Sequence, residues 1–195
     1  MAFLTKHAGL AQSLLRLVPA CLLGVNLLYA PQCAAQGQEL YKEYRVKAAY
    51  LYKFCDYVEW PAEVFDSPDS PLVIGVMGAE HMAEDLRTIV RGRTVNGRNI
   101  VVRTVYRGDN LAGMHVLFIA RSEGPYLQSI LDSARQQSTL TVTETEDYTP
   151  GGVINFVMSG DRVRFDVTLD SARDSRLKIS SRLLSVARNV TEGAS

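Results

Sequence analysis

Apolar residues recur along this chain at two different spacings, which predict an alternation of helices and strands. Between residues 39 and 58 they follow the 3.6-residue period of an amphipathic helix. Trp60-Pro61 ends this helix, because proline disfavours helical geometry in the residue before it. Residues 67–71 read Ser-Pro-Asp-Ser-Pro and predict a loop. The unbroken apolar run 72–77 then predicts a buried strand.

The middle of the chain continues the alternation. Helical periodicity covers residues 80–90 and 125–137, and the second helix has its proline in the first turn, where proline is tolerated. Runs rich in branched and apolar residues predict strands at 99–106, 116–120 and 140–143. The dipeptide Asn96-Gly97 predicts a turn ahead of the first of these strands.

The last third has a different pattern, in which two strands are adjacent in sequence. Residues 153–158 and 162–168 flank Ser-Gly-Asp at 159–161 and predict a β-hairpin. Helices are predicted at 170–176 and 180–190, the second capped by Ser180 or Ser181. The complete pattern predicts a three-layer α/β sandwich, with a mixed sheet whose centre is parallel, an antiparallel edge hairpin, and helices on both faces.

The first 35 residues are typical of a cleaved secretory signal peptide. Lys6 and Arg16 charge the leading segment, residues 17–30 are mostly apolar, and small residues precede Gln36. A membrane anchor is the alternative, but the apolar segment has only about 14 residues and a spanning helix needs about 20. We therefore expect residues 1–35 to be removed, leaving a single exported α/β domain at 36–195 in the periplasm.

Charge and cysteine content narrow the class of the exported domain. Loss of Lys6 and Arg16 reduces the 21 basic residues to 19, against 21 acidic residues, so the formal charge becomes −2. A nucleic-acid partner is not expected, because it would require a strongly basic face. Cys55 is the only cysteine left, so no internal disulfide can form. We expect Cys55 to be a buried apolar residue, with an intermolecular disulfide as the alternative.

The sequence contains little that predicts catalysis, and we expect no catalytic residue, cofactor or metal. His81 and Asp85 lie one helical turn apart but lack the further ligands of a metal site. Residues 175–178 match Ser-x-x-Lys, yet the other motifs of penicillin-recognising enzymes are missing. Two glycines at 75–78 predict a tight strand-to-helix turn rather than a nucleotide site. The acidic run 144–147 predicts a solvated loop.

Several segments together resemble the YfiR/HmsC-like family of bacterial periplasmic proteins. The opening match is VKAAYLYKF at 46–54, followed by YVEWP at 57–61. Further matches follow in the family's order, and they are the strand 72–78, GGVINF at 151–156, VRF at 163–165 and LKISSRLL at 177–184. The resemblance covers essentially the whole predicted mature chain.

This resemblance implies a regulator without catalytic activity. Similar proteins bind the periplasmic domain of an inner-membrane diguanylate cyclase and hold it inactive; their release raises cyclic di-GMP and promotes biofilm formation. An outer-membrane lipoprotein can remove such a regulator from the cyclase, and relatives form dimers. Some relatives carry paired cysteines, so control by an internal disulfide is not transferable to a chain with Cys55 alone. A sensor kinase is an alternative membrane partner.

Four residues are candidates for partner binding. Trp60 ends the first predicted helix, where it could present an aromatic anchor or plug the core. Arg162 and Arg164 alternate with Val163 and Phe165, so the two arginines face one side of the sheet. We expect Arg162, Arg164 and Phe165 to contribute to binding. The alternative for the arginines is a solvated face or an ion pair with Asp161 or Asp166.

Two other functions remain open from the sequence. One is a periplasmic small-molecule binding or sensor module, whose ligand would be a small aromatic compound. The other is a small exported hydrolase, for which Ser175 supplies the only motif.

Overall fold

The computed structural model describes residues 30–145 and 151–192. The chain divides into two units, residues 1–41 and 42–195. Of the first unit, residues 30–41 belong to helix α2 (Ala30–Cys55), which continues into the second unit. The predicted signal peptide at 1–35 lies outside the described residues except for 30–35, which are helical.

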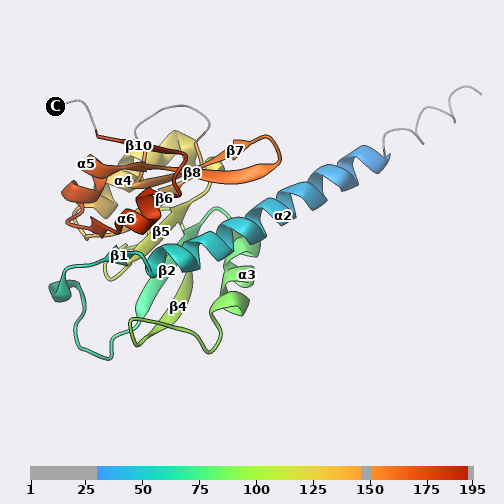
Figure 1. The fold of residues 1–195 in the computed structure, drawn as a ribbon. Coiled ribbons are helices and arrows are strands. Elements are labelled where there is room, and N and C mark those ends of the chain that lie inside the picture. Colours follow the sequence, from blue (N-terminus) through green and yellow to red (C-terminus); the bar gives the residue numbers. More distant parts are fainter. Residues whose placement is uncertain (1–29, 146–150, 193–195) are drawn as a thin grey trace, which may run out of the picture. The chain divides into compact units, whose positions relative to one another are not determined.

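An eight-stranded sheet forms the centre of this unit (Figure 1). Its strand order is β10-β8-β7-β6-β5-β2-β4-β3. The bounds are β2 Leu72–Met77, β3 Thr94–Val95, β4 Arg98–Val105, β5 Val116–Ile119, β6 Leu140–Thr143, β7 Ile154–Ser159, β8 Arg162–Thr168 and β10 Asn189–Thr191. A separate two-stranded sheet pairs β1 (Val58–Glu59) with β9 (Lys178–Ile179).

The centre of the large sheet is parallel, as the sequence predicts. Strands β7, β6, β5, β2 and β4 run in one direction, and antiparallel neighbours β8 and β3 flank them. Numbered along the chain, the five parallel strands have the order 2-1-3-4-5 of one class of doubly wound sheets. The predicted mixed sheet is therefore confirmed. Two strands of this sheet are not predicted from the sequence: β3, which pairs with β4, and β10, which lies outside the hairpin and runs parallel to β8. The short strands β1 and β9 of the small sheet are not predicted either.

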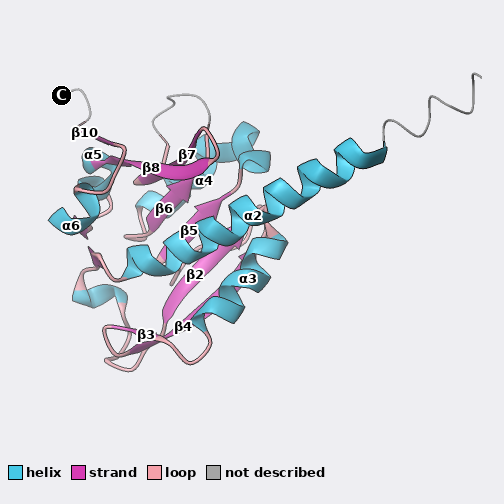
Figure 2. Ribbon diagram, turned by 45° about the vertical axis from the view of Figure 1, so that its right-hand side comes forward, coloured by secondary structure: helices cyan, strands magenta, loops and turns pink. Residues whose placement is uncertain are grey.

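Helices cover both faces of the sheet, which completes the predicted sandwich. Figure 2 shows α3 and the neighbouring part of α2 on one side, with α4 behind the strands. The bounds of the remaining helices are η1 Ala62–Val64, α3 Glu80–Val90, η2 Arg121–Tyr126, α4 Leu127–Arg135, α5 Leu169–Asp174 and α6 Ser181–Leu184.

The two faces of the sheet have separate apolar cores. On β2, the side chains of Leu72, Ile74 and Val76 belong to the core beneath α2 and α3, while Val73 and Met77 belong to the core beneath α4. This division follows from the two-residue period of a strand. Because both faces are covered, every residue of β2 is buried, which explains why its sequence is continuously apolar rather than alternating.

The first predicted helix is too long at its carboxyl end. The predicted helix ends at residue 58, whereas α2 ends at Cys55. Val58 instead pairs with Ile179 in the small sheet. The amide of Tyr57 bonds to the carbonyl of Phe54, so a tight turn ends the helix before Trp60-Pro61 is reached. Burial of Val58 suits helical periodicity and a strand equally well, so spacing alone could not separate the two.

The final helix was also overpredicted. Ser180 does cap α6, because its hydroxyl accepts the amide hydrogen of Arg182. The helix then ends at Leu184, and residues 189–191 form β10 instead of a last helical turn. The amide of Arg188 donates a hydrogen bond to the carbonyl of Phe165, and the segment that follows pairs with the otherwise open edge of β8. Pairing with a distant strand is not visible in local periodicity.

Smaller differences occur at turns. Pro125 lies inside the short helix η2, so α4 begins two residues later than a first-turn proline would indicate. Asn96 and Gly97 both have positive φ, at 50° and 81°, and form the tight turn between β3 and β4. Gly152 is required by packing, because a Cβ there would lie 2.5 Å from the carbonyl oxygen of Thr141. The conspicuous Gly-Gly before β7 therefore lets this strand start close against β6.

Candidate partner-binding surface

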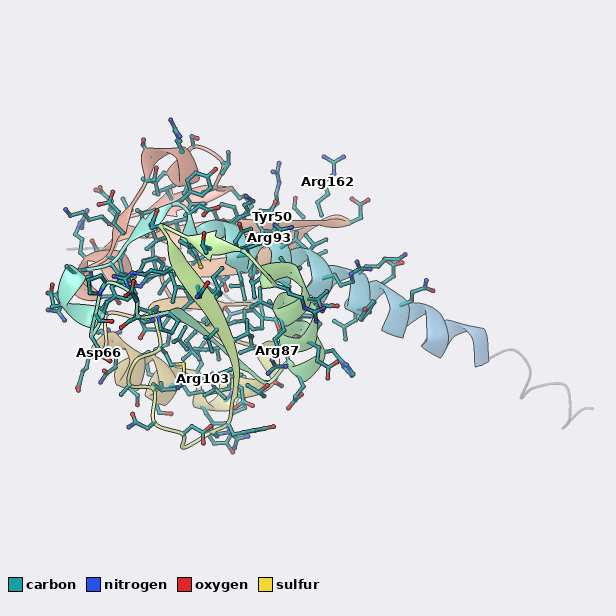
Figure 3. The ribbon with its side chains drawn as sticks, turned by 90° about the horizontal axis from the view of Figure 1, so that it is seen from below. Tyr50, Asp66, Arg87, Arg93, Arg103 and Arg162 are labelled. Atoms are coloured by element: carbon teal, nitrogen blue, oxygen red, sulfur yellow. The ribbon has the colours of Figure 1, made fainter. Side chains whose placement is uncertain are left out.

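The β7–β8 hairpin places two of the predicted residues together. Arg162 lies opposite Ser159 and Arg164 opposite Val157 in the antiparallel register. Both arginines are exposed and lie two residues apart on the same strand, so they share one face. Figure 3 shows the side chain of Arg162 extending outward from the hairpin. Asp166, one of the two ion-pair partners considered for them, instead pairs with Arg188.

Phe165 lies on the opposite face of β8 and belongs to the core. It is only 3% exposed, and its ring packs edge-on against Phe54 at 4.9 Å between centroids. Tyr50 and Phe156 complete this aromatic cluster. The strand alternation that exposes Arg162 and Arg164 turns Val163 and Phe165 toward the core, so Phe165 is buried here rather than exposed beside the arginines.

Trp60 is partly buried and tied to the sheet. Its indole N–H donates to the carbonyl of His115 at 3.0 Å, and its ring meets the His115 ring edge-on. His115 precedes β5 at the amino end of the strand, whereas the hairpin tip follows the carboxyl end of β7. Since β5 and β7 run in the same direction, Trp60 and the hairpin arginines lie at opposite ends of the sheet. They do not form one continuous site.

A charged cluster that the sequence did not reveal lies at the carboxyl ends of the parallel strands. We call it the strand-end cluster: Glu43, Tyr44, Lys47, Arg121 and Glu144. The Lys47 ammonium contacts both carboxylates. The Tyr44 hydroxyl donates to Glu144 at 2.8 Å, as does the backbone N–H of Arg121 at 2.9 Å. The Arg121 guanidinium donates to Glu43, also at 2.9 Å.

Burial distinguishes this cluster from an ordinary surface network. Lys47 is 1% exposed and Glu144 is 3% exposed. The acidic run at 144–147 therefore does not begin as a solvated loop; its other two acidic residues, at 146 and 147, lie outside the described residues. One signal was available in the sequence. Lys47 shares a helix face with Leu51 and Phe54, and a charge on a core-facing stripe requires a buried partner.

Topology explains why these residues meet. Glu144 directly follows β6, and Arg121 comes two residues after β5 ends, so both stand at the same edge of the sheet. Glu43, Tyr44 and Lys47 reach this edge from one side of α2. Ligands of doubly wound sheets bind beyond the carboxyl ends of the strands. Here that edge is partly occupied by the protein's own charged side chains.

The cluster alters the acidity of two of its members. Burial disfavours the charge on Arg121, but the carboxylates of Glu144 and Glu43 outweigh it and raise the pKa of the guanidinium above its ordinary value. Burial, followed by the charge of Glu144 and the hydrogen bond to it, raises the pKa of the Tyr44 hydroxyl. Both groups thus keep their usual protonation, and Tyr44 remains a hydrogen-bond donor at neutral pH.

A cavity adjoins the strand-end cluster. It has a volume of about 380 Å³ and is lined on one side by Lys47, Arg121 and Glu144. Phe156 and Met158 supply part of its apolar wall. Cationic, anionic and apolar groups therefore surround one concavity, as in a small-molecule site with a few polar contacts on an apolar wall.

The opposite end of the sheet holds an aromatic cluster. The rings of His115 and Phe65 stack at 4.4 Å between centroids, and the Arg98 guanidinium lies 3.8 Å from the Phe65 ring centre. The Nδ1 atom of His115 accepts the backbone N–H of Val73 at 3.1 Å. Burial lowers the pKa of this imidazole below its ordinary value, so His115 is neutral at pH 7.

The residues that match catalytic or metal-binding patterns in the sequence do not form such sites in the structure. Ser175 is 4% exposed at the end of α5, while Lys178 is exposed on β9, so the Ser-x-x-Lys pattern does not lie on one helix face. His81 lies 3.9 Å from Glu84 on the surface. Within residues 30–145 and 151–192, no three His, Cys, Asp or Glu side chains gather as metal ligands.

Cys55 occupies the core, as predicted. It is fully buried, its thiol contacts the carbonyl oxygen of Leu51 at 3.3 Å, and burial raises its pKa. A protonated and inaccessible thiol is a poor nucleophile. Over the described part of the chain, no helix combines the length and the apolar character needed to span a bilayer.

The second unit is a doubly wound α/β domain whose β7–β8 hairpin exposes two arginines. Comparison with known families is consistent with this class. The sequence profile of the YfiR/HmsC-like family matches residues 44–188, which is most of the chain. The chain belongs to this family of periplasmic regulatory proteins.

Two further comparisons add little. A conserved domain protein from Vibrio cholerae O1 biovar El Tor, known from a crystal structure, has 13% sequence identity and a TM-score of 0.46 over 61% of this chain. The match spans about half, 54%, of that protein's own length. No curated protein matches the chain.

Proposed function

We propose that this protein is a periplasmic repressor that binds the periplasmic domain of an inner-membrane diguanylate cyclase. By holding the cyclase inactive it limits cyclic di-GMP and, through it, biofilm formation. Residues 1–35 direct export and are removed, and the mature chain acts as a homodimer. An outer-membrane lipoprotein relieves the repression by competing for the regulator.

One observation carries the proposal: the family match at 44–188 spans nearly all of the described part of the second unit. The match includes the aromatic core, the strand-end cluster except Glu43, and the β7–β8 hairpin, so it concerns most of the domain. The buried thiol and the burial of Ser175 support a role in binding, since neither suits nucleophilic chemistry.

Repression follows from differential affinity. A protein that binds only the inactive conformation of the cyclase shifts its population toward that conformation. To change a mostly active population into a mostly inactive one, a preference of about 10⁴-fold is needed. We place part of this contact on Arg162 and Arg164, because arginine is enriched among residues that dominate interface energies. Trp60 is a second, separate contact.

Deletion of the gene tests the proposal in the source organism. We expect cellular cyclic di-GMP to rise, and expect this rise to vanish when the gene for the client cyclase is also deleted. Restoring the wild-type gene provides the control for polar effects. Unchanged cyclic di-GMP after deletion would contradict the proposal.

A ligand sensor is the second candidate, and the cavity beside the strand-end cluster favours it. A small aromatic compound with a carboxylate could stack near Phe156 and pair with Arg121, which lines the opening. Thermal-shift measurements with benzoate and indole-3-acetate test this function. A concentration-dependent rise in Tm that Arg121→Ala removes, and Arg135→Ala retains, supports a sensor; no shift with either compound counts against it.

A further inference from the structure

A second concave surface, the α2–α3 groove, lies away from both the hairpin and the strand-end cluster. Its volume is about 630 Å³, and side chains of α2 and α3 line it. On α2 the lining residues Lys42, Val46, Ala49 and Lys53 follow the spacing i, i+4, i+7, i+11, which keeps them on one face of the helix. From Lys42 to Lys53 this face is about 17 Å long, at the rise of an α-helix.

The groove has an apolar middle that solvent reaches. Val46 is 45% exposed, Ala49 is exposed, and Tyr50 and Ile89 are partly exposed. Tyr50, which is labelled in Figure 3, lines the groove from α2. The core-facing stripe of α2 lies on the other side of the helix, with Leu51 and Cys55 fully buried. The helix therefore has two apolar faces, only one of which the fold uses.

Charge around the groove is mainly positive. Lys42, Arg45 and Lys53 line it, while Asp85 is the only acidic residue in its described lining. A second copy of the same chain would bring three cations against three cations across a twofold interface, which is unfavourable. An acidic partner instead meets opposite charge at both ends of the apolar strip.

We propose that the α2–α3 groove is a docking site for an acidic amphipathic helix of a partner protein. An apolar stripe on that helix packs on Val46, Ala49 and Ile89, and its flanking carboxylates pair with Lys42, Arg45 and Lys53. The matching length is about 12 residues, or three turns. Insertion of a helix with apolar anchors into such a groove is an established mode of recognition. The inference goes beyond repression of a cyclase and does not depend on it.

A synthetic peptide tests the groove directly. The probe is a fluorescein-labelled helical peptide of about 16 residues, with Leu at i, i+3, i+4 and i+7 and Glu elsewhere. Its matched counterpart has Lys in place of every Glu. Fluorescence anisotropy with the full domain should show saturable binding of the acidic peptide, and at least about tenfold weaker binding of the basic one. Absence of saturable binding, or equal affinity for both peptides, would overturn the proposal.

Variants locate the binding. Val46→Glu combined with Ala49→Glu should weaken the acidic peptide about tenfold or more, and so should Lys42→Glu combined with Lys53→Glu. The matched controls are Val186→Glu, at an apolar position that is 59% exposed, and Arg103→Glu on β4. Circular dichroism checks that each variant is folded. If Val46→Glu with Ala49→Glu unfolds the domain, Lys42→Glu with Lys53→Glu still tests the groove.

A lipid surface is the competing occupant of a basic, apolar groove. Sedimentation with phosphatidylglycerol vesicles separates the two, because a flat bilayer cannot enter a groove as a single helix does. Little vesicle binding together with peptide binding supports the proposal. Strong vesicle binding that Val46→Glu with Ala49→Glu abolishes, or full peptide affinity in both groove variants, would overturn it.

Discussion

Polar side chains are buried at both ends of the central sheet, in charged form at one end and in neutral form at the other. At the carboxyl ends of the strands, Lys47 and Glu144 are buried as charges that satisfy one another. At the amino ends, His115 is buried without charge between Trp60 and Phe65. The difference shows how each end should respond to perturbation. A charge pair is sensitive to loss of one partner, whereas a neutral imidazole is sensitive to pH.

The charged end should give the largest effect. Lys47→Met removes the ammonium that contacts both carboxylates and leaves the buried Glu144 with only the Arg121 guanidinium, 3.6 Å away, as a cation. Breaking a buried pair in this way costs about 3–5 kcal/mol of stability. Urea denaturation of the mature domain measures the loss. The double variant Lys47→Met, Glu144→Met should recover part of the loss, because the buried carboxylate is removed together with its cation, while the Tyr44 hydroxyl and the Arg121 N–H lose their acceptor. A loss below about 1 kcal/mol in the single variant would show that the pair is not truly buried.

At the amino end, Arg98 should have an intermediate effect. One guanidinium nitrogen donates to the carbonyls of Ser67 and Ser70, and the group lies over Phe65. Arg98→Ala should destabilise the domain by about 1–3 kcal/mol, through lost hydrogen bonds to backbone and lost packing. Hydrogen exchange should increase across residues 61–71. Arg87→Ala, which removes one exposed contact to Thr104, is the control and should have little effect.

The pH dependence of stability separates the two ends further. Burial lowers the pKa of folded His115 below its ordinary value of 6.5; a hydrogen bond with the Val64 backbone and the charge of Asp66 oppose this shift, while the charge of Arg98 adds to it. The unfolded chain therefore binds more protons below about pH 6.5, so the stability due to neutral His115 is complete above that pH and is lost as pH falls through the folded pKa. Protonation also removes the acceptor of the Val73 N–H.

Thermal unfolding between pH 8 and pH 5 checks this expectation. The wild-type Tm should fall on acidification, and His115→Asn should flatten the part of the fall that His115 causes. An identical pH profile in both proteins would contradict the assignment.

The hairpin arginines should have the smallest effect on stability. Arg162 and Arg164 are exposed, so Arg162→Ala with Arg164→Ala should change the free energy of unfolding by no more than about 0.5 kcal/mol. Repression by the same variant should be lost if these residues contact the cyclase. Exposed Arg135, which is paired with Asp132 on α4, provides the control position. Full repression by a folded double variant would show that the hairpin arginines do not contribute to the interface with the cyclase.

Elements with a clear period could be predicted from the sequence, and elements fixed by distant pairing could not. The strand Leu72–Met77 and the helix Glu80–Val90 have the predicted bounds. The strand is buried on both faces and is therefore continuously apolar, whereas the helix is buried on one face and shows apolar residues at helical spacing. Strand β10 is not predicted, because this segment is extended through its pairing with the edge strand β8 and not through its own sequence pattern.

The site was harder to predict for a related reason. Exposure of Arg162 and Arg164 follows from alternation along one strand, which sequence reports directly. The strand-end cluster joins residues about 100 positions apart, Tyr44 with Glu144, so nothing in either neighbourhood identifies the partner. A buried Lys47 on an apolar helix face was the one local sign that such a partner exists.

Cyclase activity in membranes tests the central claim most directly. Inner membranes from a strain lacking this protein contain the client cyclase, and purified residues 36–195 can be added to sealed vesicles that expose its periplasmic side. We predict a saturable fall in cyclic di-GMP synthesis with the wild-type domain and none with Arg162→Ala, Arg164→Ala. The membranes must come from a strain in which deletion of the gene raised cyclic di-GMP. If synthesis in these membranes stays constant at a saturating concentration of the wild-type domain, direct repression is contradicted.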